Sequence, residues 1–260
     1  MKYVRRGAGN PLILVHGLGS SRNAWCLNTL TLAQHCDVIL PDLPGHGESA
    51  AEADSGSFAG LARSFETWLE TEGLVGSDMV GSSMGARLVL EMARRGKSGA
   101  VIALDPGGFW DGWERGFVSS TLSASGSLLR SLRPALPALA RNPASRSLLL
   151  AQLAARPWDL NGDLVATELA SIAATGTFDS LVHDLAYGPP QAGPSASRTG
   201  PVAIGWGRHD RLCFPSQALR AQRAFPEARL VWFERSGHFP MWEEPDQAVD
   251  LILETINLRR

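Results

Sequence analysis

The amino-acid sequence predicts an α/β domain with a mostly parallel, twisted sheet that carries helices on both faces. Short runs of β-branched and aliphatic residues alternate with longer stretches of helical periodicity. Several of the apolar runs end in glycine-rich segments, as strands do where they pass into loops. One long stretch, 109–187, breaks the alternation because it contains no strand pattern. With 260 residues, the chain has the length of one such domain with an insertion.

Seven short segments have the composition of strands. Leu12–Val15 is a continuous run of leucine, isoleucine and valine, typical of a strand that is buried on both faces of a parallel sheet. A short edge strand is expected at the N-terminus. The expected strands are Tyr3–Arg6, Leu12–Val15, Asp37–Leu40, Met79–Val80, Ala100–Leu104, Val202–Trp206 and Arg229–Phe233.

Helical patterns fill most of the spaces between these strands. In the second expected helix, apolar residues recur at intervals of three and four, as at Phe58, Leu61 and Phe65. Because strands and helices alternate along the first hundred residues, neighbouring strands should run parallel. The expected helices are Asn23–Gln34, Phe58–Glu72, Ala86–Arg95 and Pro245–Leu258.

The strand-free stretch predicts a helical lid inserted between two strands of the sheet. Its helical runs are rich in alanine, leucine and serine and are punctuated by prolines. The segment Gly188–Pro201, which is rich in proline, glycine and serine, is expected to be a linker that leads back to the sheet. The predicted division is therefore a core domain of residues 1–108 and 188–260 and a lid of residues 109–187.

Composition excludes several classes of function. The hydrophobic fraction of 44% and the charged fraction of 19% are those of a globular protein, and a net charge of −2 gives no reason to expect nucleic acid as a partner. The three cysteines are odd in number and form no C-x-x-C pattern, which favours a reducing compartment. We find no signal peptide and no apolar run long enough to span a bilayer. A cytoplasmic location is expected.

The pentapeptide Gly81-Ser82-Ser83-Met84-Gly85 lies between an expected strand and an expected helix. A G-x-S-x-G sequence in that context predicts a nucleophile elbow, a strained turn that exposes the central serine at the end of the sheet. Its glycines leave room for the tight turn. Ser83 is therefore the candidate nucleophile.

A serine hydroxyl is a poor nucleophile at its free pKa, so it needs a base and a group that orients the base. Asp210 follows the strand Val202–Trp206, and His238 follows the strand Arg229–Phe233. Parallel strands bring such loops to one edge of the sheet. We therefore expect His238 to be the general base and Asp210 to be the carboxylate that orients it. Asp105 also follows a strand and is an alternative for the acid.

An acyl-transfer intermediate also needs hydrogen-bond donors for its oxyanion. The backbone N–H of Met84, next to the nucleophile, is expected to be one donor. The second is expected from the glycine-rich turn after Leu12–Val15, at the N–H of Leu18.

Together these motifs resemble the α/β-hydrolase superfamily, and within it the small lidded serine esterases and carbon–carbon bond hydrolases. The resemblance covers the chain outside the lid, with a shortened leading hairpin, and implies the α/β-hydrolase fold with a Ser–Asp–His triad. It does not specify the substrate. The motifs are His16-Gly17-Leu18-Gly19, Asp42-Leu43-Pro44-Gly45-His46-Gly47, the elbow, Gly207-Arg208-His209-Asp210 and Gly237-His238.

The lid sequence offers two hypotheses about substrate. Aromatic residues at its start and beside the catalytic histidine could bind an apolar group, or they could be ordinary packing: Trp110, Trp113 and Phe239. Between Arg115 and Trp158 there are six arginines and no acidic residue. They could form a basic rim for an anionic substrate or an acidic acyl carrier, or simply a solvated face.

The sequence shows no cluster with metal-ligand spacing, no phosphate loop and no dinucleotide fingerprint, so no metal or cofactor is implied. We predict a serine hydrolase, a carboxylesterase that cleaves a small-molecule ester with an apolar small-to-medium acyl or alkyl group through an acyl-enzyme. The alternatives are hydrolysis of a carbon–carbon bond in a vinylogous diketone, a lactonase or acyltransferase, and a ligand receptor with little turnover.

Overall fold

A seven-stranded sheet forms the centre of the part of the chain that the structure, a computed structural model, describes: residues 1–194 and 200–257. The strand order is β1-β3-β2-β4-β5-β6-β7. β1 pairs antiparallel with β3, and all the other pairs are parallel. The strands are β1 (Tyr3–Gly7), β2 (Pro11–Val15), β3 (Asp37–Pro41), β4 (Asp78–Ser82), β5 (Val101–Leu104), β6 (Val202–Gly207) and β7 (Arg229–Phe233).

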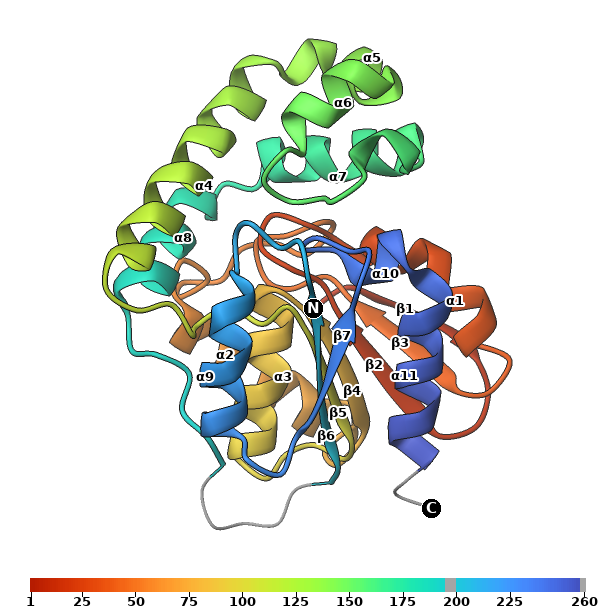
Figure 1. The fold of residues 1–260 in the computed structure, drawn as a ribbon. Coiled ribbons are helices and arrows are strands. Elements are labelled where there is room, and N and C mark those ends of the chain that lie inside the picture. The colour runs from red at the N-terminus through yellow and green to blue at the C-terminus, as the bar shows by residue number, and fades with distance from the viewer. Residues whose placement is uncertain (195–199, 258–260) are drawn as a thin grey trace.

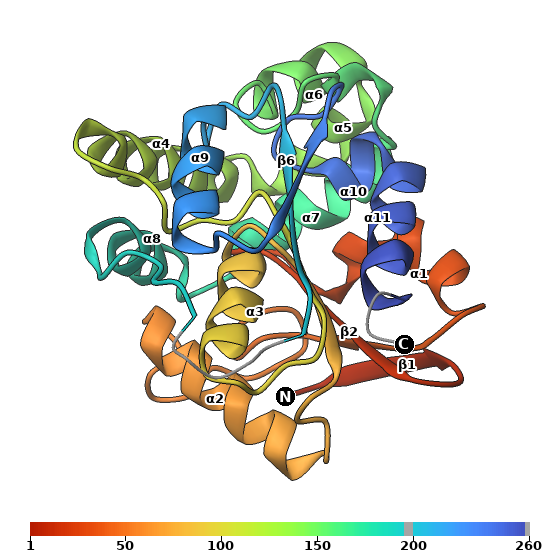
Figure 2. The ribbon, with the colours of Figure 1, turned by 60° about the horizontal axis from the view of Figure 1, so that its bottom comes forward.

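Helices cover both faces of the sheet, which confirms the predicted fold class (Figure 1). Figure 2 shows α2, α3 and α9 on one face and α1 and α11 on the other. These helices are α1 (Cys26–Leu32), α2 (Phe58–Thr71), α3 (Met84–Arg94), α9 (Pro215–Ala224) and α11 (Pro245–Asn257), with the short turns η1 (Arg22–Trp25) and α10 (Pro240–Glu243). Among the described residues, no helix is long and apolar enough to cross a membrane.

The buried run of β2 shows how one strand serves both faces. Successive side chains of a strand point to opposite sides. Ile13 and Val15 pack into the cluster beneath α2, α3 and α9, whereas Leu12 and Leu14 pack into the cluster beneath α1 and α11. All four are buried. A continuous apolar run therefore predicts a central strand here because neither face of the sheet meets water.

A helical insertion lies between β5 and β6, over one edge of the sheet (Figure 1). Its helices begin at Trp113 and end at Tyr187, within the stretch that the sequence marks as strand-free. They are α4 (Trp113–Ser131), η2 (Arg133–Ala135), α5 (Leu136–Arg141), α6 (Pro143–Leu149), η3 (Pro157–Asp159), α7 (Gly162–Ala174) and α8 (Phe178–Tyr187).

One expected helix is divided in the structure, one observed helix has no expected counterpart, and parts of two expected segments lie outside the described residues. The helix expected at Asn23–Gln34 is a 3₁₀ turn followed by α1, and Ser21 caps the turn by accepting a hydrogen bond from the Asn23 N–H at 3.3 Å. Helix α9 has no counterpart among the expected elements, since it buries only small or polar residues and so gives a weak apolar periodicity. Residues 195–199 of the expected linker and Leu258 of the expected last helix lie outside the described residues.

A substitution at Phe65 of α2 tests the packing of α2 against the sheet. Its side chain is wholly buried against the sheet, so Phe65→Ala should lower the free energy of unfolding by about 3–5 kcal/mol. Leu30→Ala is the matched control, because Leu30 is 70% exposed and should change stability by less than about 0.5 kcal/mol. Urea unfolding followed by tryptophan fluorescence measures both. Equal effects of the two substitutions would contradict the assigned packing.

Candidate active site

Ser83 sits between β4 and α3 in a strained backbone conformation. Its φ of 56° and ψ of −115° are unusual for a residue with a side chain. A Cβ at Gly81 would clash with the carbonyl of Gly85, and one at Gly85 would clash with the carbonyl of His16. Only glycine therefore fits at both flanking positions, and the strand–turn–helix context expected for the elbow is present.

His238 connects Ser83 to Asp210. The His238 Nε2 atom lies 2.8 Å from the Ser83 Oγ, and its Nδ1 atom lies 2.7 Å from the Asp210 Oδ2. The His238 and Asp210 side chains are almost completely buried, at 2% and 0% exposure. The three residues that the sequence singles out thus form one continuous hydrogen-bonded chain, although Ser83 and His238 are 155 residues apart.

The Asp210 carboxylate is fixed by its own loop as well as by His238. Its Oδ1 atom accepts hydrogen bonds from the N–H groups of Leu212 and Cys213 at 2.8 and 2.9 Å. Asp105, the alternative acid, makes no hydrogen bond with His238 in the part of the chain that the structure describes. Its Oδ1 atom accepts a hydrogen bond from the Gly207 N–H at 2.9 Å, and its carboxyl faces that of Asp210.

The His238 loop is also attached to the lid. The His238 N–H donates to the Leu153 carbonyl at 2.7 Å. The buried Glu243 carboxylate joins the same two segments, because it accepts hydrogen bonds from Ala155, Arg156 and Gly237 N–H groups at 2.6–2.8 Å. Sequence reasoning missed Glu243, since its partners are up to 88 residues away.

The turn after β2 lies directly against the nucleophile. A Cβ at Gly17 would be 3.2 Å from the Cβ of Ser83. No hydrogen bond within the described residues uses the N–H of Leu18, and the N–H of Met84 begins α3, where a helix has no internal acceptor. Leu18 and Met84 line the same cavity as Ser83, and their N–H groups, which the sequence proposes as oxyanion donors, have no hydrogen-bond partner among the described residues.

His16 braces this turn. Its Nε2 atom accepts a hydrogen bond from the Leu43 N–H at 3.0 Å, so its Nδ1 atom carries the proton and donates to the Gly17 carbonyl at 2.8 Å. Complete burial lowers the pKa of His16 to about 4, which keeps the ring neutral. A neutral His16 can make both hydrogen bonds at once.

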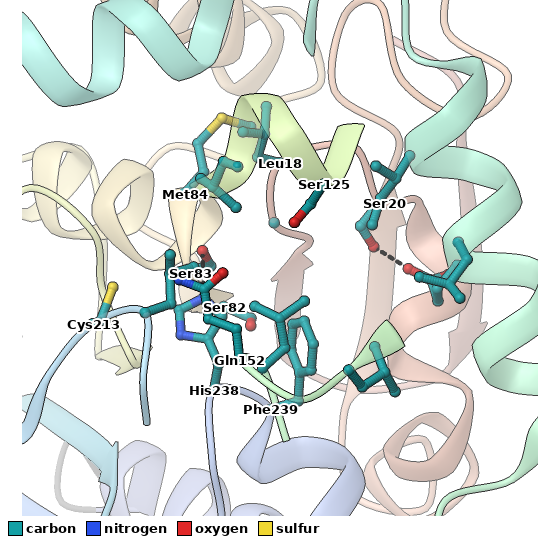
Figure 3. A pocket seen from close by; sticks show the side chains of 18 of the residues that line it. Leu18, Ser20, Ser82, Ser83, Met84, Ser125, Gln152, Cys213, His238 and Phe239 are labelled. Carbon is teal, nitrogen blue, oxygen red and sulfur yellow. Dashed lines mark hydrogen bonds between the residues drawn. The ribbon is translucent and has the colours of Figure 1, made fainter. Parts of the chain in front are cut away.

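A cavity of about 260 Å³ opens beside Ser83, between the lid and the sheet. Figure 3 shows Ser83 and His238 on one side of it and Ser20 on the other. Most of its surface is aliphatic or aromatic, supplied by α4, α6, α7 and the loop that carries Phe239. No arginine or lysine of the described residues lines it, and its one carboxylate is Glu168 of α7.

Two of the three aromatic residues expected at the substrate site line this cavity. Trp110 lines the cavity, and its Nε1–H donates to the Leu185 carbonyl at 3.1 Å. Phe239 also lines the cavity, and its ring packs on that of Trp242, with centroids 4.1 Å apart. Trp113 lies outside the cavity. It lies in the first turn of α4, is 69% exposed, and packs against Phe214.

Most of the lid arginines have partners within the protein. Arg130 pairs with Asp179 at 2.9 Å and Arg141 pairs with Asp163 at 2.7 Å. Arg146 is buried and donates to four backbone carbonyls of the lid. Arg156 donates to the Glu243 carbonyl at 3.1 Å. Four of the six arginines thus hold the lid together or tie it to the core.

Glu168 is a second buried acid that sequence reasoning missed. It is 3% exposed and accepts a hydrogen bond from the Ser20 hydroxyl, across the contact between α7 and the turn after β2. Burial raises the pKa of its carboxyl to about 7. Glu168 stands at a position where the helical periodicity predicts an apolar residue. This pattern could have indicated a buried acid with a partner, because a buried carboxyl group needs a partner.

Asp210, Cys213 and His238 place potential ligand atoms within 4.8 Å of one another. The carboxylate and the imidazole already hydrogen bond with each other, and burial raises the pKa of the Cys213 thiol well above its usual range. A neutral thiol is a poor metal ligand. The chemistry of this group therefore fits proton transfer better than metal binding.

The family model described as "Alpha/beta hydrolase family" matches residues 12–251. The chain belongs to this family. It is 28% identical to a 2-hydroxy-6-oxononadienedioate/2-hydroxy-6-oxononatrienedioate hydrolase of Burkholderia vietnamiensis, over 97% of this chain and 89% of the relative. In structure it is similar to a thermophilic esterase from Thermogutta terrifontis, with a TM-score of 0.75, 20% identity and coverage of 99% and 93% of the two chains.

A larger relative shares the whole domain. The chain is 27% identical to the dihydrolipoyllysine-residue acetyltransferase component of the acetoin cleaving system of Cupriavidus necator, over 94% of this chain. It spans 63% of that relative's length. The proteins that the chain resembles are thus named for hydrolysis of different substrates and for acyl transfer, so the likeness specifies the fold and not the substrate.

Glu168 gives a pH-dependent contribution to stability. Because its folded-state pKa of about 7 lies above the ordinary value of 4.5, its contribution is complete below pH 4.5 and is lost as the pH rises through 7. The loss is on the order of 3 kcal/mol. Glu168→Gln should therefore reduce the fall in unfolding free energy between about pH 5 and about pH 8. The exposed Glu227→Gln is the control, and identical profiles for both variants would refute the prediction.

Proposed function

We propose that this protein is a serine hydrolase that cleaves carboxylic esters through an acyl-enzyme. The observation that carries the proposal is the buried chain from the Asp210 carboxylate through His238 to the Ser83 hydroxyl, with heavy-atom distances of 2.7 and 2.8 Å. These are hydrogen-bond distances, so a proton can pass from the hydroxyl to the imidazole as the serine attacks.

In the acylation step, the Ser83 Oγ adds to the ester carbonyl while the His238 Nε2 takes its proton. The negative charge that develops on the carbonyl oxygen is stabilised by the N–H groups of Leu18 and Met84 and by the N-terminus of α3. Asp210 holds the Nδ1–H and stabilises the imidazolium. When the tetrahedral intermediate collapses, His238 returns the proton to the leaving alcohol.

In the deacylation step, water takes the place of the alcohol. His238 removes a proton from the water as it attacks the acyl carbon, and the same two N–H groups stabilise the second oxyanion. Collapse of this intermediate releases the carboxylic acid and returns the proton to Ser83. No further group is required for either step.

The cavity supports an apolar acyl or alkyl group of small to medium size. Its volume of about 260 Å³ and its aliphatic lining suit a hydrocarbon group. The absence of arginine and lysine among its described lining residues weighs against a carboxylate on the substrate, because a buried charge without a partner is costly. An uncharged ester is therefore the substrate class that we propose.

A second candidate is hydrolysis of a carbon–carbon bond in a vinylogous diketone, which the relative from Burkholderia vietnamiensis favours. The name of that relative describes a dicarboxylate substrate, for which this cavity offers no cation among its described residues. If the chain cleaves a carbon–carbon bond, the substrate should be an uncharged dienol.

Transfer of the acyl group to an acceptor other than water uses the same acyl-enzyme. The acetyltransferase component from Cupriavidus necator makes this a reaction to measure beside hydrolysis. Adding an alcohol or a thiol to the ester assay separates the two, because transfer yields a new ester or thioester at the expense of free acid. An enol ester or lactone would be opened by the same steps.

The nucleophile is tested by burst kinetics on p-nitrophenyl esters from acetate to decanoate. Wild type should release a burst of p-nitrophenol equal to the enzyme concentration, and Ser83→Ala should abolish it and lower kcat by at least about 10⁴-fold. Ser131→Ala, on the exposed side of α4, is the control and should behave as wild type. If wild type and Ser83→Ala were equally inert on esters and on dienols, a ligand receptor would replace the proposed enzyme.

The substrate pocket is tested by filling it. Leu122→Trp on α4 adds bulk inside the cavity, so kcat/KM should fall at least about tenfold for octanoate and change little for acetate. Leu219→Trp is the control, because Leu219 is 51% exposed on α9 and lines no part of the cavity. A uniform loss across all chain lengths in Leu122→Trp would show that the acyl group lies elsewhere.

A further inference from the structure

Asp105 is a buried acid that the proposed reaction leaves without a role. It follows β5, has no exposed surface, and adopts a φ of 46°, the only described non-glycine residue besides Ser83 with a positive φ. Its N–H donates to the Gly205 carbonyl at 2.9 Å, which fixes the residue between β4 and β6. Asp105 therefore combines a strained backbone with a wholly buried carboxyl group, beside the hydrogen-bonded residues Asp210, His238 and Ser83. Strain and burial of this kind are costly, so they need a physical reason.

The carboxyl of Asp105 faces that of Asp210. Two ionised carboxylates only accept hydrogen bonds, so a hydrogen bond between these two groups requires a proton on one of them. The Oδ2 atom of Asp105 is buried and has no hydrogen-bond donor among the described residues. With a proton on Oδ2, Asp105 can donate a hydrogen bond to Asp210. This hydrogen bond replaces the repulsion between two carboxylates.

The hydrogen-bond partners indicate which carboxyl holds the proton. Asp210 accepts hydrogen bonds from the N–H groups of Leu212 and Cys213 and from His238, all of which stabilise its ionised form. Asp105 accepts one, from Gly207. Because donors favour the charged form of a carboxyl, the charge belongs on Asp210 and the proton on Asp105.

The other ionisable groups around Asp105 act in the same direction. Burial, followed by the negative charge of Asp210, raises the pKa of Asp105 well above its usual range, and the Glu243 carboxylate contributes further. The Cys213 thiol is neutral and brings no compensating charge, and His238 contacts Asp210 rather than Asp105. No described cation pairs with Asp105.

We propose that Asp105 is a positioning residue that keeps its proton on Oδ2 and donates it to the Asp210 carboxylate. The inference rests on the proposed serine hydrolase function. The donated hydrogen bond holds the Asp210 carboxylate in the orientation in which its Oδ2 faces the His238 Nδ1. The chain of hydrogen bonds then has four members, Asp105, Asp210, His238 and Ser83, each fixed by the next.

This arrangement predicts different effects for two substitutions at one position. Asparagine keeps the Oδ1 acceptor for Gly207, supplies an N–H donor in place of the acid proton, and tolerates a positive φ. Glycine accepts the same φ but removes the donor. Asp105→Asn should therefore retain kcat within about threefold, whereas Asp105→Gly should lower kcat roughly tenfold or more with little change in KM.

The pH profile separates positioning from a general loss of structure. Without the donor, the negative charge on Asp210 is less dispersed and favours the protonated imidazole more strongly. The acid limb of kcat/KM should then move to higher pH in Asp105→Gly and stay in place in Asp105→Asn. If Asp105→Asn lowers kcat as much as Asp105→Gly does, or if Asp105→Gly is as active as wild type, Asp105 does not act as a donor and the proposal is wrong.

The proton itself is measured by infrared spectroscopy, which requires no turnover. The spectrum of wild type minus that of Asp105→Asn should show the C=O stretch of a protonated carboxylic acid at about pH 8, where most Glu168 is ionised. Glu168→Gln should retain that band. If the spectrum of wild type minus that of Asp105→Asn lacked the C=O band, the proposal would be overturned. The band does not depend on activity. If wild type were inert on esters and dienols, the proposed serine hydrolase function would be wrong, but the spectra would still decide whether Asp105 carries the proton.

Discussion

The backbone at Ser83 is the constraint on which the site depends. Its positive φ turns the chain sharply from β4 into α3, and the turn exists only because glycines flank it where any larger residue would collide with carbonyl groups. The strain places the hydroxyl at the end of the sheet and the first N–H groups of α3 beside it. Everything else in the site is arranged around that fixed oxygen.

Parallel strand order then determines which loops can reach Ser83. β4, β5, β6 and β7 are neighbours, so the residues that follow them lie at one edge of the sheet. Ser83, Asp105, Asp210 and His238 come from these four strand ends in turn. The four groups can therefore form a chain of hydrogen bonds without any long-range distortion of the sheet.

Buried acids join the lid to this edge. Glu243 binds N–H groups of both the lid and the His238 loop, and Glu168 reaches from α7 to Ser20 in the turn after β2. Both contacts lie close to the groups that we propose act on the substrate. The lid is thus part of the framework that positions His238 and the turn after β2, as well as the wall of the apolar cavity.

The sequence by itself determined the strands, the elbow and the order of serine, acid and histidine, because these depend on residues close together in the chain. Periodicity, glycine spacing and the position of a residue after a strand are local properties. Only the tertiary structure decided that Asp210 contacts His238 while Asp105 faces Asp210, that Trp113 lies outside the cavity, and that Glu168 and Glu243 are buried with partners. Those facts depend on packing between segments far apart in the chain, which no local pattern records.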